Sequence, residues 1–389
     1  MVKKKVSKKS AKNTQKTLKK GAKAKDSYID WKIPAAFIAG ILVTALYFGL
    51  PDIEFAPTTS PDQTITTLFI LNDPGCALCE DSWIEPRVQE DVNITIQRID
   101  SNSAQGQSLI TSLGITSLPA AFFSKDFEQT SAFEEYSYYG WVQEKGEYYV
   151  IGFDGAKDLA RTESSSPKID VFVMSMCPYG TPAQINMISL KKAIPGFELG
   201  MHYIVDVQSQ EELNASYAQL RAQYDSICAS PELAENYGLS CTEAEWAQIN
   251  PSSKCELKGD NYYCSLHGPE ELEANMAQVC AMHLTNDWDD FILAHIESNF
   301  NNTFAASAAG ISIDDLNDCL NSDLGIELLN ERIALSNELG VGSSPSYLFD
   351  NIYFNPQMDP ATALCMLHPE LSGCESISSL QIAQSSGSC

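Results

Sequence analysis

The longest hydrophobic run in the chain extends from Ile33 to Leu50 and contains no charged side chain. As an α-helix it would span about 27 Å, close to the thickness of a bilayer's hydrocarbon core. The preceding residues 1–32 are rich in lysine. This pattern predicts a basic cytoplasmic tail, a transmembrane helix over 33–50, and an extracytoplasmic chain beyond Pro51. The alternative is a cleaved signal peptide, but both the basic and the apolar regions are long for one.

Beyond this run the apolar segments are short and separated by turns. Residues 51–63 are rich in proline and polar side chains, which predicts a linker. The segments that follow predict a β-α-β-α-β-β order: strand 64–71, helix 80–89, strand 93–99, helix 104–113, and strands 120–123 and 147–153. That order is typical of a three-layer α/β domain, here over 64–160. Pro86 is expected to kink or end the first helix.

The pattern then starts again after a second linker, RTESSSP at 161–167. A strand over 168–176 runs into Cys177-Pro178-Tyr179-Gly180, where a helix is expected to open. Residues 208–335 are mostly helical in pattern, broken by Pro231, Gly238 and the turn at 258–261. A Ser-Pro pair and the strand SYLF follow. The sequence therefore predicts a duplicated α/β fold, whose second copy over 168–389 carries a helical insert.

Charge is distributed very unevenly along the chain. The formal net charge is −26, yet twelve of the 25 basic residues lie between Lys3 and Lys32. The remainder is therefore even more acidic than the total indicates. Such a surface repels nucleic acid and anionic lipid headgroups, so neither is an expected partner of the folded part.

All twelve cysteines lie beyond the hydrophobic run, which fits an oxidising compartment where disulfides persist. Several flank short loops and are expected to form local disulfides: Cys255 with Cys264, Cys365 with Cys374, Cys228 with Cys241, and Cys280 with Cys319. If these four form and Cys76 pairs with Cys79, then Cys177 and Cys389 are left.

Cys76 and Cys79 form a C-x-x-C pair at a predicted strand-to-helix junction. At a helix start, free backbone N–H groups and the helix dipole favour the thiolate of the first cysteine. The second cysteine can then resolve a mixed disulfide, so the pair can cycle between dithiol and disulfide. Two alternatives are a purely structural disulfide and half of a zinc site, although no second C-x-x-C or C-x-x-H completes four ligands.

This arrangement resembles the thioredoxin superfamily, through the cysteine pair after the first strand and through Leu118-Pro119 about forty residues later. The resemblance implies two thioredoxin-like domains, with Cys76 as nucleophile, Cys79 as resolving thiol and Pro119 as a cis-proline beside them. In the second copy, Cys177 to Gly180 is similar to a DsbA-type or glutaredoxin-type motif whose second cysteine is glycine. Pro345 would be its cis-proline.

A further resemblance lies in the insert. His267-Gly268, Glu271, Asn275 and Cys280 follow the signature of the gamma-interferon-inducible lysosomal thiol reductase family. Leu272 stands where that signature has its middle cysteine. The resemblance implies the same fold for roughly 168–350.

Together these features predict a membrane-anchored thiol–disulfide oxidoreductase that acts on exported proteins, exchanges electrons with a membrane or soluble redox partner, and needs no cofactor. One alternative is a redox-inactive thioredoxin-like module that binds clients near Pro119 and Pro345. Another is a copper chaperone that uses Met176 and Cys177, since copper(I) prefers soft sulfur ligands. The five histidines show no spacing typical of a metal site.

Overall fold

The structure is a computed structural model that describes residues 64–153, 155–355, 358–375 and 388–389. The predicted cytoplasmic tail (1–32), transmembrane helix (33–50) and first linker (51–63) lie outside these residues. Within the described ranges, every helix is too short or too polar to span a bilayer.

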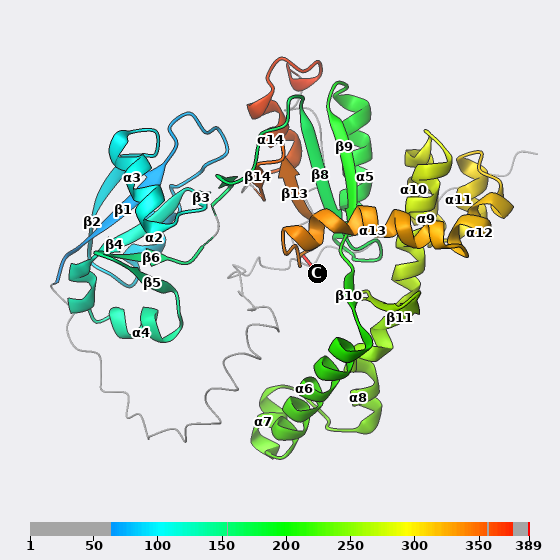
Figure 1. Cartoon of the computed structure of the whole chain (residues 1–389), viewed down its shortest axis with the longest axis horizontal. Coiled ribbons are helices and arrows are strands. Elements are labelled where there is room, and N and C mark those ends of the chain that lie inside the picture. Colours follow the sequence, from blue (N-terminus) through cyan, green and yellow to red (C-terminus); the bar gives the residue numbers. More distant parts are fainter. Residues whose placement is uncertain (1–63, 154, 356–357, 376–387) are drawn as a thin grey trace, which may run out of the picture. The chain divides into compact units, whose positions relative to one another are not determined.

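The first unit, residues 64–160, is built on a sheet with the strand order β2-β1-β4-β6-β5. Strand β1 is parallel to β2, and the other neighbours are antiparallel. Figure 1 shows this unit in blue to cyan. Its strands are β1 (Thr66–Asn72), β2 (Ile94–Asp100), β4 (Ala120–Ser124), β5 (Val142–Lys145) and β6 (Tyr148–Ile151). Its helices are α2 (Ile84–Gln89), α3 (Ala104–Leu113) and α4 (Phe133–Tyr138), with a 3-10 turn at Lys125–Gln129.

Strand β1 is central because both of its faces are covered. Leu68 and Ile70 pack into one hydrophobic cluster, while Leu71 packs into another on the opposite face. Successive side chains of a strand point to opposite faces, so burial on both faces requires helices on each side of the sheet. The first unit contains the predicted strands and helices, and in addition the short strands β3 (Ser117–Leu118) and β7 (Lys157–Asp158), helix α4 and strand β5, which the sequence pattern did not predict.

One local expectation was wrong. Pro86 neither kinks nor ends α2, because it lies in the first turn of a helix that begins at Ile84. A first-turn residue has no intrahelical partner for its N–H, so proline is tolerated there.

The second unit, residues 168–389, repeats this arrangement. Its core strands have the order β9-β8-β13-β14, with β8 parallel to β9 and β13 antiparallel to both β8 and β14. The first unit's β2-β1-β4-β6 has the same order and directions, so this strand arrangement occurs twice. The elements are β8 (Lys168–Val173), α5 (Gly180–Ala193), β9 (Glu198–Tyr203), α13 (Asp323–Glu338), β13 (Ser346–Phe349), β14 (Tyr353–Phe354) and α14 (Pro360–Leu367).

Two short strands from before residue 160 extend the second sheet. Strand β3 (Ser117–Leu118) pairs with β7 (Lys157–Asp158), and β7 pairs with Tyr353 of β14. The predicted linker at 161–167 also contacts the second unit: Arg161 Nε donates to the backbone oxygen of Asn351 at 2.8 Å. All described residues, those of the first and of the second unit alike, lie in one compact part of the chain.

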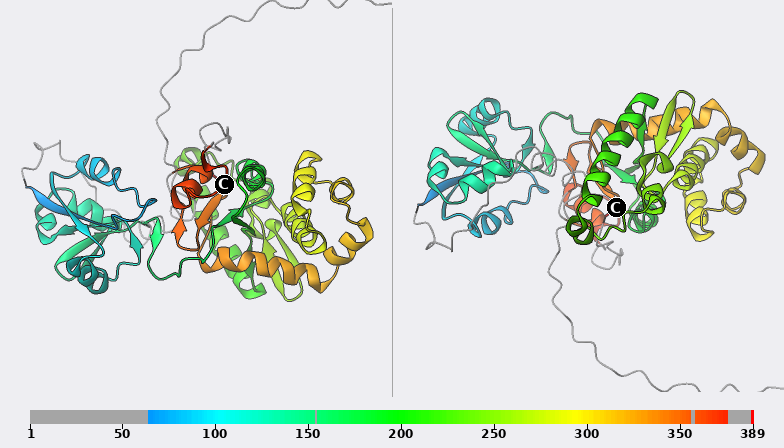
Figure 2. Two further views of the ribbon diagram at one scale, coloured as in Figure 1. Left: turned by 90° about the horizontal axis from the view of Figure 1, so that it is seen from above. Right: turned by 90° about the horizontal axis from the view of Figure 1, so that it is seen from below.

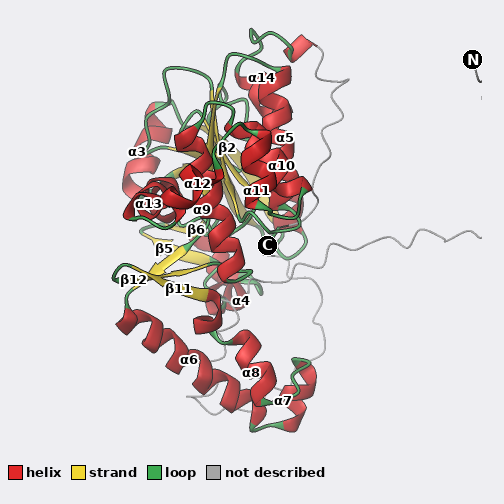
Figure 3. Cartoon of the chain, turned by 90° about the vertical axis from the view of Figure 1, so that its right-hand side faces the viewer, coloured by secondary structure: helices red, strands yellow, loops and turns green. Residues whose placement is uncertain are grey.

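The insert between β9 and α13 is mostly helical, as its sequence pattern indicated, but it also contains strands that the pattern did not indicate. It holds a small antiparallel sheet, ordered β10-β12-β11, in which the turn predicted at 258–261 is the tip of the β11–β12 hairpin. In Figure 3 the yellow hairpin lies between the red helices α6 and α9. The insert's strands are β10 (Asp206–Gln208), β11 (Cys255–Lys258) and β12 (Asn261–Cys264). Its helices are α6 (Gln210–Cys228), α7 (Pro231–Asn236), α8 (Glu243–Ile249), α9 (Pro269–Leu284), α10 (Trp288–Glu297), α11 (Asn302–Ala308) and α12 (Ile313–Leu320), with a 3-10 turn at Pro251–Lys254.

All twelve cysteines are paired. The four local disulfides expected from spacing are present, namely Cys228–Cys241, Cys255–Cys264, Cys280–Cys319 and Cys365–Cys374. The remaining pairs are Cys76–Cys79 and Cys177–Cys389. Figures 1 and 2 agree that the chain end marked C lies against the second unit.

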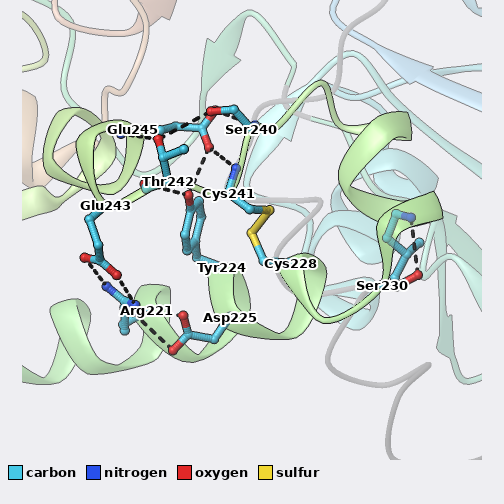
Figure 4. Close-up of a disulfide and its surroundings, with 11 residues drawn as sticks. Arg221, Tyr224, Asp225, Cys228, Ser230, Ser240, Cys241, Thr242, Glu243 and Glu245 are labelled. Carbon is cyan, nitrogen blue, oxygen red and sulfur yellow. Dashed lines mark hydrogen bonds and ion pairs between the residues drawn. A yellow bond between two sulfur atoms is a disulfide. The ribbon is translucent and has the colours of Figure 1, made fainter.

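The disulfide between Cys228 and Cys241 holds a small helical module together (Figure 4). It joins the end of α6 to the residue before the N-cap of α8. Arg221 of α6 reaches Glu243 of α8 at 2.9 Å, and Glu245 accepts the backbone N–H of Cys241 at 2.8 Å. These contacts are all local, so this disulfide is structural in character.

A buried histidine makes the stability of the second unit depend on pH. Burial lowers the pKa of His295 in α10 from its ordinary 6.5 to about 4. As pH falls below 6.5, the unfolded chain takes up a proton that the folded chain refuses, so stability is lost between pH 6.5 and 4. From pH 7 to 5 we expect a loss on the order of 2 kcal/mol in the free energy of unfolding.

Urea unfolding at the two pH values tests this. The His295→Gln variant should lose most of the difference, whereas His283→Gln, at an exposed position of α9, should keep it. An unchanged pH dependence in His295→Gln would refute the assignment.

Candidate functional site

The Cys76–Cys79 disulfide lies in the loop that follows the central strand β1. A turn places the Cys76 N–H 3.0 Å from the backbone oxygen of Asp73, and the two Cα atoms of the disulfide are 5.4 Å apart. Contrary to the sequence expectation, no helix begins at this pair, because α2 starts only at Ile84. The helix dipole therefore does not act on Cys76 as the sequence had indicated.

Nearby charge is balanced by an ion pair. Asp73 accepts from Lys157 of β7 at 2.7 Å and from Asn102 at 2.9 Å. Burial alone would raise the pKa of the Asp73 carboxyl, but these hydrogen bonds and one from the Gly75 N–H lower it on balance. Asp73 is thus an anion whose charge Lys157 offsets, which weakens its opposition to a thiolate at Cys76.

Pro119 lies beside the cysteine loop, as predicted, and its peptide bond with Leu118 is cis. Cys79 and Leu118 pack in the same hydrophobic cluster. A pocket of about 210 Å³ adjoins them, lined by Leu78, Glu80, Trp83, Pro119, Gly155, Ala156, Phe354 and Asn355. The structure therefore brings together the predicted residues Cys76, Cys79 and Pro119.

The two sulfurs of this pair differ in access. Cys79 is 5% exposed, whereas Cys76 is only partly buried. Between them, Leu78 is buried in the hydrophobic cluster of the second unit, with Ile352 and Tyr353. Cys76 is thus the more exposed residue of the pair.

The loop after β8 has the geometry that the sequence predicted for Cys76. Helix α5 begins at Gly180, and the N–H of its N-cap residue Tyr179 lies 3.4 Å from Cys177 Sγ, to which it donates. Cys177 is fully buried and bonded to Cys389. A sulfur at this position faces the positive end of the helix.

Pro345 is also close to its cysteine. The Ser344–Pro345 peptide bond is cis, and Cys177 Sγ lies 3.5 Å from the backbone oxygen of Ser344. The Ser344 hydroxyl accepts the Met174 N–H at 2.8 Å. Cys177 and Pro345 are thus brought together, as Cys76 and Pro119 are in the first unit.

Glu271 is a site residue that the sequence reasoning missed. This fully buried carboxylate of α9 accepts the Met176 N–H at 2.9 Å and contacts His267 Nδ1 at 2.9 Å. It therefore anchors the loop that carries Cys177. The thiol-reductase-like signature contained both His267 and Glu271, but nothing in the sequence indicated that they lie against Met176.

Among the described residues, no group of three or more His, Cys, Asp or Glu side chains could hold a metal ion. In this oxidised structure Cys177 is in a disulfide, so it offers no thiolate to copper beside Met176.

No family model and no curated protein matches the sequence. Solved structures with a similar chain include a proposed protein disulfide isomerase from Nitrosomonas europaea, 14% identical, with a TM-score of 0.29 over 53% of this chain and 97% of that one. Reduced DsbA1 from Neisseria meningitidis is 12% identical, with a TM-score of 0.26 over 57% of this chain and 91% of that one.

The crowding at Gly180 gives a test of the second site's packing. A Cβ atom at Gly180 would lie 2.4 Å from Ser344 Oγ and 2.6 Å from the Met174 backbone oxygen. Gly180→Ala should therefore cost about 1–3 kcal/mol of stability through overpacking. Gly342→Ala is the matched control, because a Cβ there meets nothing within 4 Å. Chemical denaturation of both variants checks this, and equal stabilities would contradict it.

Proposed function

We propose that this protein is a membrane-anchored, extracytoplasmic thiol–disulfide oxidoreductase that acts on disulfides of exported proteins through Cys76 and Cys79. The observation that carries the proposal is the Cys76–Cys79 disulfide, held in the loop after a buried central strand beside cis-Pro119. A C-x-x-C pair at this place can open and close without rearranging the sheet.

Cys76 is the exchanging sulfur because it is the more accessible of the two. In the oxidising direction, a client thiolate attacks Cys76 Sγ, the 76–79 bond breaks, and Cys79 leaves as a thiolate. A second client thiolate then displaces Cys76, so the client gains a disulfide and the pair gains two electrons. The reducing direction reverses these steps. Its starting point is the Cys76 thiolate, whose charge Lys157 helps to accommodate beside Asp73.

The proposed location rests on the chain's chemistry. Residues 33–50 would anchor the protein with residues 1–32 in the cytoplasm. Six disulfides suit an oxidising compartment rather than a reducing one. A membrane or soluble redox partner would restore the 76–79 pair after each cycle.

The test is turnover of a model disulfide substrate by the full chain. In a background that carries Cys177→Ser and Cys389→Ser, Cys76→Ser should abolish turnover, because no sulfur then starts the exchange at this site. Cys79→Ser should also stop turnover but accumulate a mixed disulfide on Cys76, detectable by mass spectrometry under non-reducing conditions.

The matched control is Cys365→Ser, which opens a local disulfide elsewhere and should keep turnover. Full activity in Cys76→Ser would refute the proposal. If the Cys76→Ser, Cys79→Ser double variant still bound unfolded clients while the wild type lacked turnover, the client-binding module would be the better description.

A further inference from the structure

Cys177 and Cys389 are 212 residues apart in sequence, and their disulfide meets at the strand-to-helix junction of the second unit. We propose that this pair is a second exchangeable disulfide, in which Cys389 occupies the position that the cysteine of an extended client peptide would take. This goes beyond the proposed function, which uses only Cys76 and Cys79.

The backbone of Cys389 is held by main-chain hydrogen bonds to Ser344. Its N–H donates to the Ser344 oxygen at 3.0 Å, and its own oxygen accepts the Ser344 N–H at 3.4 Å. Two residues that exchange both hydrogen bonds form the pairing unit of antiparallel strands. Main-chain pairing of this kind does not depend on side chains, so any extended segment with a cysteine can make the same contacts.

Cys177 lies just before the start of helix α5. Its sulfur receives the Tyr179 N–H at the start of α5, a helix of fourteen residues. Backbone donors and the dipole at a helix start stabilise a thiolate, so Cys177 is a good leaving group when its disulfide is attacked. Cys177 is fully buried while Cys389 is only partly buried, so Cys389 is the residue of the pair at which we expect an incoming thiol to attack.

The motif from Cys177 to Gly180 has no room for a second cysteine at position 180. Any side chain at position 180 would place its Cβ 2.4 Å from Ser344 Oγ. The sulfur that pairs with Cys177 must therefore come from another segment, and Cys389 supplies it.

The disulfide between Cys177 and Cys389 joins positions 212 residues apart, unlike the four local disulfides. Cys255 and Cys264 face each other on adjacent strands, and Cys280 and Cys319 are buried between α9 and α12. Cys389 is linked to the second unit by its disulfide and by the pair of main-chain hydrogen bonds to Ser344.

Thiol–disulfide exchange with a dithiol client takes place in two steps. A thiolate of a dithiol client attacks Cys389 Sγ, a client–Cys389 bond forms, and the 177–389 bond breaks with Cys177 leaving as a thiolate. The client's second thiolate then attacks its own sulfur in the mixed disulfide and releases Cys389. The client loses two electrons and becomes a disulfide, and the 177–389 pair is reduced to two thiols.

The first experiment titrates the disulfides of the full chain carrying Cys76→Ser and Cys79→Ser. The protein is equilibrated with glutathione buffers of decreasing potential, alkylated, and mapped by peptide mass spectrometry. The 177–389 pair should open at a ratio of reduced to oxidised glutathione at least ~10-fold lower than the four local disulfides need. Opening only together with those four would overturn the proposal.

The second experiment frees Cys177 with Cys389→Ser in the same background. The probe is the pentapeptide Ala-Ser-Cys-Ser-Ala as its mixed disulfide with thionitrobenzoate, whose release is followed by absorbance. Cys177 should be captured at least ~10-fold faster than Cys374, freed by Cys365→Ser as the matched control.

An N-methyl-cysteine version of the probe lacks the N–H that Cys389 donates to Ser344. It should react several-fold more slowly with Cys177 and at an unchanged rate with Cys374. Equal capture rates for Cys177 and Cys374 would refute the proposal, even in variants whose circular dichroism shows the native fold. Because Cys76 and Cys79 are absent from both experiments, either outcome leaves the test of the first site unaffected.

Discussion

Both candidate sites depend on one constraint, the burial of a central strand on its two faces. Strand β1 is covered by hydrophobic clusters on either side, and β8 is buried from Ile169 to Val173. Moving such a strand by one residue would expose its apolar set to water, so its register is fixed. The loop at its end, with Cys76 or Cys177, is therefore held in place by the core rather than by its own few contacts.

The two sites have the same strand arrangement but differ in the origin of their second cysteine and in the start of the helix that follows. The first keeps two cysteines within one loop, but its helix begins later, at Ile84. The second keeps the helix start at Gly180 but has one cysteine in the motif, and Cys389 completes the pair. The sequence had predicted both a C-x-x-C pair and a helix start at Cys76. The first site has only the cysteine pair, and the second has only the helix start.

The sequence predicted the features that depend on local pattern. Alternating apolar runs located the core strands, and cysteine spacing gave the four local disulfides correctly. The cis-prolines at 119 and 345 were found beside their cysteines because the motif order repeats. The late start of α2 was missed because helix propensity does not register the turns that Asp73 and Gly75 organise. The contact of Glu271 with Met176 was missed because this hydrogen bond joins residues 95 positions apart in the sequence.

The residues that precede the two cis-prolines differ in the segment with which their backbone pairs. Leu118, before Pro119, pairs with Lys157 of β7, a strand that continues into the second sheet and is fixed further by the ion pair to Asp73. A client strand could add there only by displacing β7. Ser344, before Pro345, pairs instead with Cys389, whose link is a disulfide that a thiol can open. On the proposed function, clients of the first site would approach from the side of Cys76 and the Trp83 pocket. The proposed second site would accept an extended peptide once its disulfide is reduced.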